Sequence, residues 1–188
     1  MNRTNTIRVL SPAAHVTRCD GLLGLDYLRL NAAIYPVAGS GLLVKPGAVP
    51  AVSISSYLSH LGYTSVPLVF AGSVMIAEGH LEDHPMRMAI DTGAGFSTFD
   101  VGFVRTALGR ALTLMEIPIE GVDRKTPDEY RFTPKEIDVG GFRLPPIQLA
   151  ASQTPSFAEG GINAFMGQDL MGTHRAIVDL GDSVLWLK

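Results

Sequence analysis

The sequence is poor in cysteine, with Cys19 as the one thiol among 188 residues. A single thiol excludes an intrachain disulfide framework and a zinc site built on cysteines. Basic residues are also scarce, since lysine and arginine number 15 against 18 aspartates and glutamates, which gives a net charge of −3. Nucleic acids and anionic membranes require a clustered basic face. We therefore expect neither as a partner.

Long hydrophobic runs are missing as well. No apolar stretch reaches the length of a membrane span, and residues 1–5 are polar with no apolar segment behind them, so the sequence predicts no membrane helix and no visible secretion signal. A cytoplasmic location is the default expectation, and an extracytoplasmic one would require a signal segment upstream. The 5 histidines show no paired spacing, so we expect no metal and no other cofactor.

The most informative segment that is present is an Asp-Thr-Gly-Ala turn after the apolar run 86–90. A strand that enters this turn presents the carboxylate of Asp91 at the strand end. Thr92 can hydrogen-bond the turn backbone, and Gly93 permits close backbone approach. The plain alternative is an ordinary Asp-Gly turn.

A second motif lies near the C-terminus. Two apolar residues and a glycine, Phe165, Met166 and Gly167, are followed by Gln168 and Asp169. A short helix and two apolar segments, 176–180 and 184–188, complete the chain. Asp169 is in a position to cap that helix, because aspartate is a favoured cap residue.

Together these motifs resemble the retropepsin family of aspartic proteases over residues 62–188. The resemblance implies an all-β, retropepsin-type barrel with one or two short helices and a polypeptide substrate. It implies that Asp91 is the catalytic acid and base, that its turn is Thr92, Gly93 and Ala94, and that the psi-shaped loop beneath it is Phe165, Met166 and Gly167. It also implies a flap over the substrate at Glu120, Gly121 and Val122. The sequence departs from viral members at Gln168, where they commonly carry arginine, so ion pairing of the viral type is not expected.

An internal repeat supplies a further observation. Gly24, Asp26, Ala33 and Ile34 each recur 143 positions later, as Gly167, Asp169, Ala176 and Ile177. An ungapped match of this kind indicates two tandem copies of one unit. We therefore expect three parts: residues 1–46 as the tail of a preceding homologous lobe, 47–61 as a linker with a short helix, and 62–188 as the protease-like domain. By the same repeat, Asp26 would cap its own helix. The resemblance also implies that Leu42 to Lys45 forms interface sheet near the terminal strand Leu185 to Lys188, because duplicated lobes of this family join through their terminal strands.

Peptide hydrolysis without a metal or a covalent intermediate needs two carboxyl groups, one to deprotonate a water and one to polarise the carbonyl. The sequence contains one Asp-Thr-Gly. The second aspartate must therefore come from a dimer mate around a twofold axis or from a preceding lobe. The leading hypothesis is an aspartic endopeptidase. The alternatives are a catalytically silent peptide-binding or dimerisation module of the same fold, and an unrelated all-β structural domain in which the Asp-Thr-Gly is accidental.

The rest of the pattern is mostly β. Strands are expected at 66–70, 74–81 and 86–90, with a hairpin formed by 137–139 and 142–144 around two glycines. Helices are expected at 53–61 and 100–110.

Overall fold

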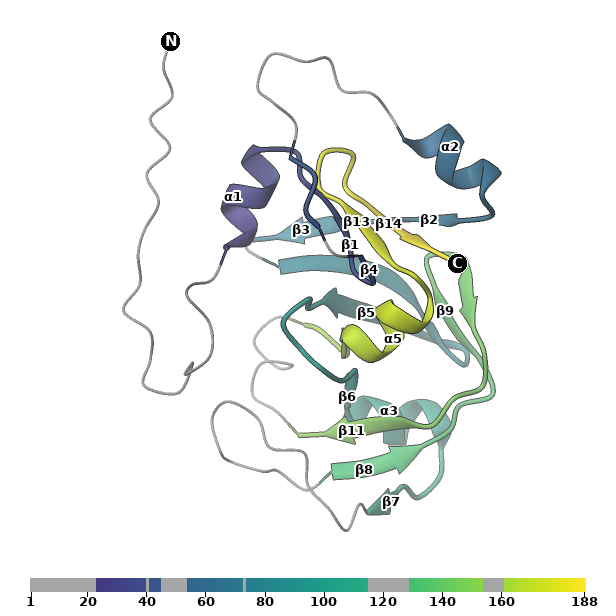
Figure 1. The fold of residues 1–188 in the computed structure, drawn as a ribbon. Helices are drawn as coiled ribbons and strands as arrows, with labels where there is room; N and C mark the ends of the chain where they lie inside the picture. The colour runs from purple at the N-terminus through teal and green to yellow at the C-terminus, as the bar shows by residue number, and fades with distance from the viewer. Residues whose placement is uncertain (1–22, 40, 45–53, 73, 115–128, 154–160) are drawn as a thin grey trace.

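A computed structural model of the chain describes residues 23–39, 41–44, 54–72, 74–114, 129–153 and 161–188. These residues form two β-sheets and four short helices (Figure 1). The predicted all-β class is confirmed. The expected flap residues Glu120, Gly121 and Val122 lie outside the described residues. Among the described residues, no helix has the length and apolar character needed to cross a bilayer.

The helices are α1 (Leu25–Leu30), α2 (Ser55–His60), α3 (Val101–Leu108) and α5 (Gln168–Thr173). The strands are β1 (Ile34–Pro36), β2 (Thr64–Pro67), β3 (Val69–Ala71), β4 (Val74–Leu81), β5 (His84–Ile90), β6 (Thr98–Asp100), β7 (Thr113–Leu114), β8 (Glu129–Phe132), β9 (Ile137–Val139), β10 (Phe142–Leu144), β11 (Leu149–Ser152), β12 (Ala164–Met166), β13 (Ile177–Asp179) and β14 (Val184–Leu187).

The large sheet runs in the order β10-β9-β4-β5-β12-β6-β11-β8-β7, with β3 also paired to β4. Local sequence signals explain several of its parts. The β9–β10 hairpin turns at Gly140 and Gly141, whose φ values of 58° and 91° lie in the region that glycine tolerates best. Helix α3 begins after Asp100, whose Oδ1 accepts a hydrogen bond from the Phe103 N–H at 2.7 Å.

The expected single strand over 66–70 is wrong, because the chain leaves one sheet for the other at Leu68. The N–H of Leu68 donates to the Ser183 carbonyl at 2.8 Å. β2 before this residue joins the small sheet, and β3 after it pairs with β4. Leu68 is 6% exposed, so the crossing is part of the core.

The small sheet has the order β1-β13-β14-β2. Terminal strand β14 therefore lies between β13 and β2, and residues 42–44, the described part of the segment expected near it, do not pair with it directly. Leu43 instead forms an isolated bridge with Ile34. The register of β2 against β14, from Val184 opposite Pro67 onward, already fills that edge.

The sequence repeat is also a repeat of local structure. Helices α1 and α5 begin at positions 25 and 168 and end at 30 and 173, so both pairs of bounds are 143 apart. Each helix is followed by a residue with positive φ, Ala32 at 45° and Arg175 at 47°. The next residue closes the turn in both, because Ala33 N–H donates to the Leu28 carbonyl at 2.9 Å and Ala176 N–H to that of Met171 at 2.8 Å.

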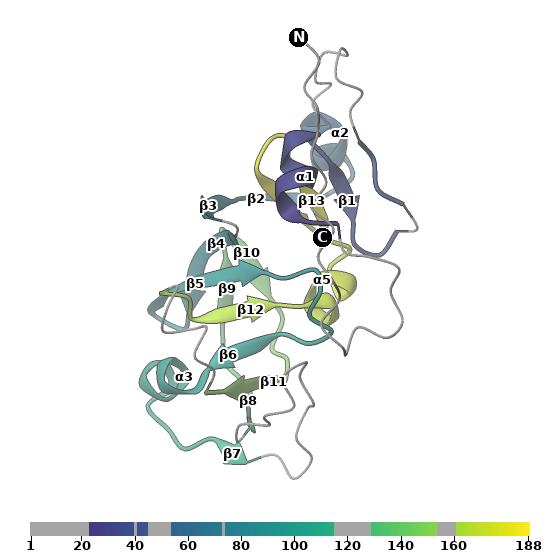
Figure 2. The same cartoon turned by 90° about the vertical axis from the view of Figure 1, so that its left-hand side faces the viewer.

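The described segment 25–37 packs onto the C-terminal part of the chain. The Leu180 N–H donates to the Ala33 carbonyl at 2.9 Å, and the Val37 N–H donates to the Ala176 carbonyl at 2.8 Å. The Arg29 guanidinium lies 3.7 Å from the centre of the Phe70 ring, within cation–π range. Both views show α1 and β1 alongside β13 (Figure 2).

Candidate active site

The Asp91 turn connects two strands that are not neighbours. β5 leads into it and β6 leads out of it, while β12 lies between them, parallel to β5 and antiparallel to β6 (Figure 2). The Asp91 N–H donates to the Met166 carbonyl of β12 at 3.0 Å. Inserting one strand between the two arms of a turn gives the psi shape. The turn therefore sits at a strand end with a buried strand beneath it.

Backbone and side-chain hydrogen bonds fix the shape of the turn. Gly93 N–H donates to Asp91 Oδ1 at 2.9 Å, and Ala94 N–H donates to the Asp91 carbonyl at 3.3 Å. Gln168 holds the turn from outside, since its Nε2 donates to the Thr92 carbonyl at 2.6 Å and its backbone N–H to the Ala94 carbonyl at 2.8 Å. Sequence reasoning treated Gln168 only as a departure from a viral pattern and missed this contact.

Gly167 is where the turn presses most closely on the strand beneath. A Cβ built at this residue would lie 2.6 Å from both the carbonyl carbon and the oxygen of Phe96, and 2.9 Å from the Ala94 oxygen. Its φ of −98° is open to any residue. Glycine is therefore needed here for close backbone approach rather than for its dihedral freedom.

Asp169 does not cap the helix, which corrects the expectation from the sequence. The residue at the N-cap of α5 is Gly167, which makes no side-chain cap hydrogen bond. Asp169 Oδ1 instead accepts from the Ser97 N–H at 2.9 Å, from Ser97 Oγ at 2.6 Å and from the Leu170 N–H at 2.8 Å. Asp26 does not cap α1 either, where Gly24 is the N-cap residue without a side-chain cap bond.

Ser97 completes a buried network that locks the outgoing arm of the turn to the psi strand. It is 1% exposed, and its Oγ accepts a hydrogen bond from the Gly167 N–H at 2.9 Å while donating to Asp169. Charge-assisted bonds of this kind are stronger than neutral ones. The available signal was a serine in the segment after Asp91 and an aspartate just after Gly167, but only the fold brings them together.

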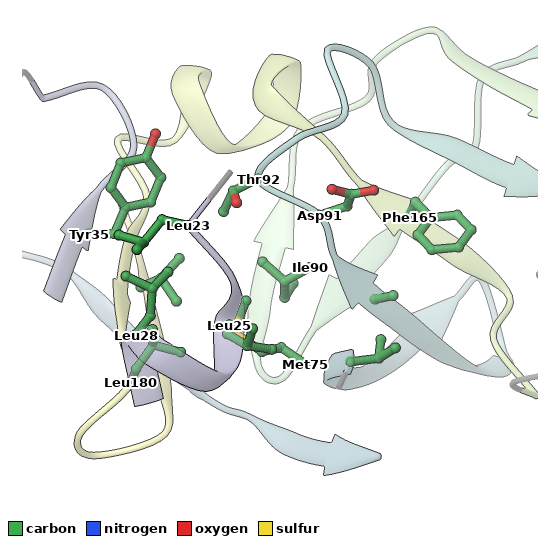
Figure 3. A pocket seen from close by; sticks show the side chains of 13 residues that line it. Leu23, Leu25, Leu28, Tyr35, Met75, Ile90, Asp91, Thr92, Phe165 and Leu180 are labelled. Atoms are coloured by element: carbon green, nitrogen blue, oxygen red, sulfur yellow. The ribbon is translucent and has the colours of Figure 1, made fainter. Parts of the chain in front are cut away.

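An apolar cavity of about 280 Å³ adjoins the turn. Its lining comes from the segment 23–35, from the strands around Asp91 and from β13 and the turn after it: Leu23, Leu25, Leu28, Tyr35, Val74, Met75, Ala89, Ile90, Asp91, Thr92, Phe165, Val178 and Leu180. Figure 3 shows the side chains of Leu25, Ile90 and Met75 below the carboxylate of Asp91 in that view. Asp91 is exposed and is the one carboxylate among these lining residues.

The structure thus brings together most of the residues predicted for the site. Asp91 to Ala94 form the turn, and Phe165, Met166 and Gly167 lie beneath or beside it. Met166 is 1% exposed.

The chain was compared with known proteins. No protein-family model matches it, and no curated protein does. Solved structures that are similar include the retroviral protease-like domain of Ddi1 from Leishmania major, with a TM-score of 0.46 and 13% identity over 58% of this chain and 84% of that one. A retropepsin-like aspartic protease from Rickettsia conorii gives a TM-score of 0.49 and 11% identity over 66% and 93% of the two chains. EIAV protease in complex with the inhibitor HBY-793 gives a TM-score of 0.40 and 17% identity over 57% of this chain and 86% of that one.

The described residues form a mostly β fold of two sheets with short helices. All three TM-scores are below 0.5, so no argument about this chain is drawn from these structures. The features that bear on function are the chain's own: the inserted strand β12, the Asp91 turn and the cavity beside it. Such a setting argues against the accidental Asp-Thr-Gly of an unrelated domain.

Proposed function

We propose that this chain contributes one half of the active site of an aspartic endopeptidase, with Asp91 as its catalytic carboxylate. The observation that carries the proposal is the placement of Asp91 on a psi-shaped support, where its N–H is bound by the Met166 carbonyl at 3.0 Å and its side chain is exposed beside an apolar cavity. A rigid backbone and an open carboxylate are what a positioned acid or base requires.

The chemistry uses two carboxyl groups that share one proton. The ionised group removes a proton from a water, whose oxygen attacks the carbonyl carbon of the peptide bond, while the protonated group donates its proton toward the carbonyl oxygen. Collapse of the resulting tetrahedral species breaks the C–N bond, with a proton delivered to the leaving nitrogen. Asp91 is one of the pair, and the second aspartate comes from a dimer mate or a preceding lobe.

The supporting roles follow the same proposal. The Gly93 N–H bonds Asp91 Oδ1 at 2.9 Å and so fixes the orientation of the carboxylate. Thr92 and Ala94 offer their carbonyls to Gln168, which keeps the turn from opening. Glu120, Gly121 and Val122 remain proposed as the flap over an extended polypeptide substrate.

A catalytically silent peptide-binding or dimerisation module is the second candidate. It is favoured by one observation, that Asp91 is the one acidic residue among those lining the cavity. A site with a single carboxylate has an acid or a base but not both.

Binding of a statine-type inhibitor tests the proposal, because transition-state analogues bind catalytic sites far more tightly than substrates do. The protein is isolated under native conditions from cells that produce it, with whatever polypeptides accompany it, and titrated by calorimetry. We expect saturable binding that Asp91→Asn abolishes. Asp100→Asn is the matched control on the same segment, because asparagine caps α3 as well as aspartate does. Absence of binding to the parent protein would favour the silent module.

A further inference from the structure

The pairing of β1 with β13 is self-complementary. Ile34 lies opposite Asp179, Tyr35 opposite Val178 and Pro36 opposite Ile177. By the 143-residue offset, β1 is the counterpart of β13, so each strand pairs with its own equivalent in reverse order. This is the pattern of a twofold contact between two like units, with its local axis between Tyr35 and Val178. Both of these residues also line the cavity beside Asp91.

The described residues therefore contain two elements of the same kind but one Asp-Thr-Gly turn. The second, at Met166 to Asp169, supports the Asp91 turn. The first, at Leu23 to Asp26, has no turn upon it among the described residues. A Cβ on Gly24 would meet only the Asp26 carboxylate within 4 Å, at 2.5 Å from Oδ1, whereas a Cβ on Gly167 would meet the backbone of the turn. Leu23 is 52% exposed, and its counterpart Met166 is 1% exposed.

A second copy of this chain does not fit the open element. Its Asp91 turn is already seated on its own Met166 and Gly167. The edge of β13 that a mate would use is also filled, by β1 of the same chain. The partner that binds here must carry such a turn and must lack its own supporting element, the counterpart of Met166 to Asp169.

We propose that residues Leu23 to Asp26 are the docking site for a second Asp-Thr-Gly or Asp-Ser-Gly turn, carried by a retropepsin-type strand–turn–strand unit that lacks its own closing helix. This rests on the proposed function. The contacts follow from the equivalent half: the Leu23 carbonyl accepts from the N–H of the incoming aspartate, as Met166 does from Asp91. The Asp26 carboxylate accepts from a serine or threonine of the unit, as Asp169 does from Ser97.

The docked turn completes the pair of carboxylates. Leu23, Leu25 and Leu28 line the same cavity as Asp91. A turn that docks on Leu23 would therefore enter this cavity from the side opposite Asp91, across the local twofold axis between β1 and β13. The partner aspartate therefore reaches the site through the first copy of the repeat, and no symmetric homodimer is needed.

The test supplies such a unit to the complete chain. A second copy of residues 62–161 is inserted between Arg18 and Cys19, with nothing removed. Because position 19 is 143 before position 162, the inserted copy runs into Cys19 as the original runs into Ile162. Amide hydrogen exchange reads out whether the turn of the insert is protected, and Gly24→Ala is introduced with and without the insert.

We expect a monomer in which the exchange of the inserted turn is slowed at least roughly tenfold relative to the same sequence unfolded. Gly24→Ala should remove that protection in the insert variant, and in the parent chain it should cost no more than the loss of a glycine N-cap. An unprotected insert, or protection that Gly24→Ala does not alter, would overturn the docking site. A stable dimer of the parent chain that Gly24→Ala dissociates would show that a second copy occupies the element instead. A protected insert without peptide hydrolysis would contradict the proposed function and leave the docking site standing.

Discussion

Replacing Gly167 by alanine probes how tightly the Asp91 turn presses on its support. The new methyl group would lie 2.6 Å from the carbonyl carbon and oxygen of Phe96 and 2.9 Å from the Ala94 oxygen. These are backbone atoms, which do not rotate away, so the turn has to shift. Overpacking of this kind costs about 1–3 kcal/mol. In a chain of this size each kcal/mol lowers the melting temperature by about 2–4 °C, so we expect a fall of roughly 2–12 °C.

Gly24→Ala is the matched control. Gly24 is also an N-cap glycine without a side-chain cap bond, so any loss from replacing glycine at an N-cap is common to both variants. Its new methyl group would meet only the end of the Asp26 side chain, which can rotate. Thermal unfolding followed by circular dichroism should therefore show a loss for Gly167→Ala well above that for Gly24→Ala. Equal losses in the two variants would refute the claim that the Asp91 turn is seated on Gly167.

Three further outcomes are expected. Ser97→Ala should destabilise the fold by about 1–3 kcal/mol in urea titrations, because it leaves the buried Gly167 N–H without its acceptor. Thr106→Ala on the exposed face of α3 is the control and should cost little. Equal urea midpoints for the two variants would contradict the Ser97 network. Burial lowers the pKa of His174, although a hydrogen bond to the Lys188 backbone acts in the opposite direction. The folded state therefore binds a proton less readily than the unfolded chain, so stability should fall as pH drops below about 6.5. A His174→Asn variant with the same pH dependence would show that another group is responsible. Deleting residues 1–46 should uncover the outer edge of β13 and cause concentration-dependent aggregation measurable by light scattering, and a soluble deletion variant of unchanged stability would show that the first copy is dispensable.

The sequence predicted what local signals determine. β4 at Val74–Leu81 and the β9–β10 hairpin follow from alternation and from turn glycines, and α3 follows from its cap at Asp100. The site motif was found because the Asp91 turn and its glycine support carry strong local patterns. The crossing at Leu68 was missed because the signal of Pro67, at which β2 ends, was not used to divide the run 66–70.

Contacts between distant residues account for the rest of what was missed. Ser97 and Asp169 are 72 positions apart, and Gln168 and Thr92 are 76 apart, so neither pair shows in any local pattern. The repeat predicted a helix after Asp26, where α1 lies, but it did not predict that β1 pairs with β13. Strand partners depend on which edges the whole fold leaves open.

Hydrolysis of an unfolded protein by the natively isolated chain and its associated polypeptides is the most direct test of Asp91 as a catalytic carboxylate. Activity should peak at the pH where the carboxyl pair holds one proton and fall on both sides. Asp91→Asn should abolish it while leaving thermal unfolding unchanged, and Asp100→Asn should retain it. Hydrolysis that persists in Asp91→Asn at the parent's optimal pH would contradict the account.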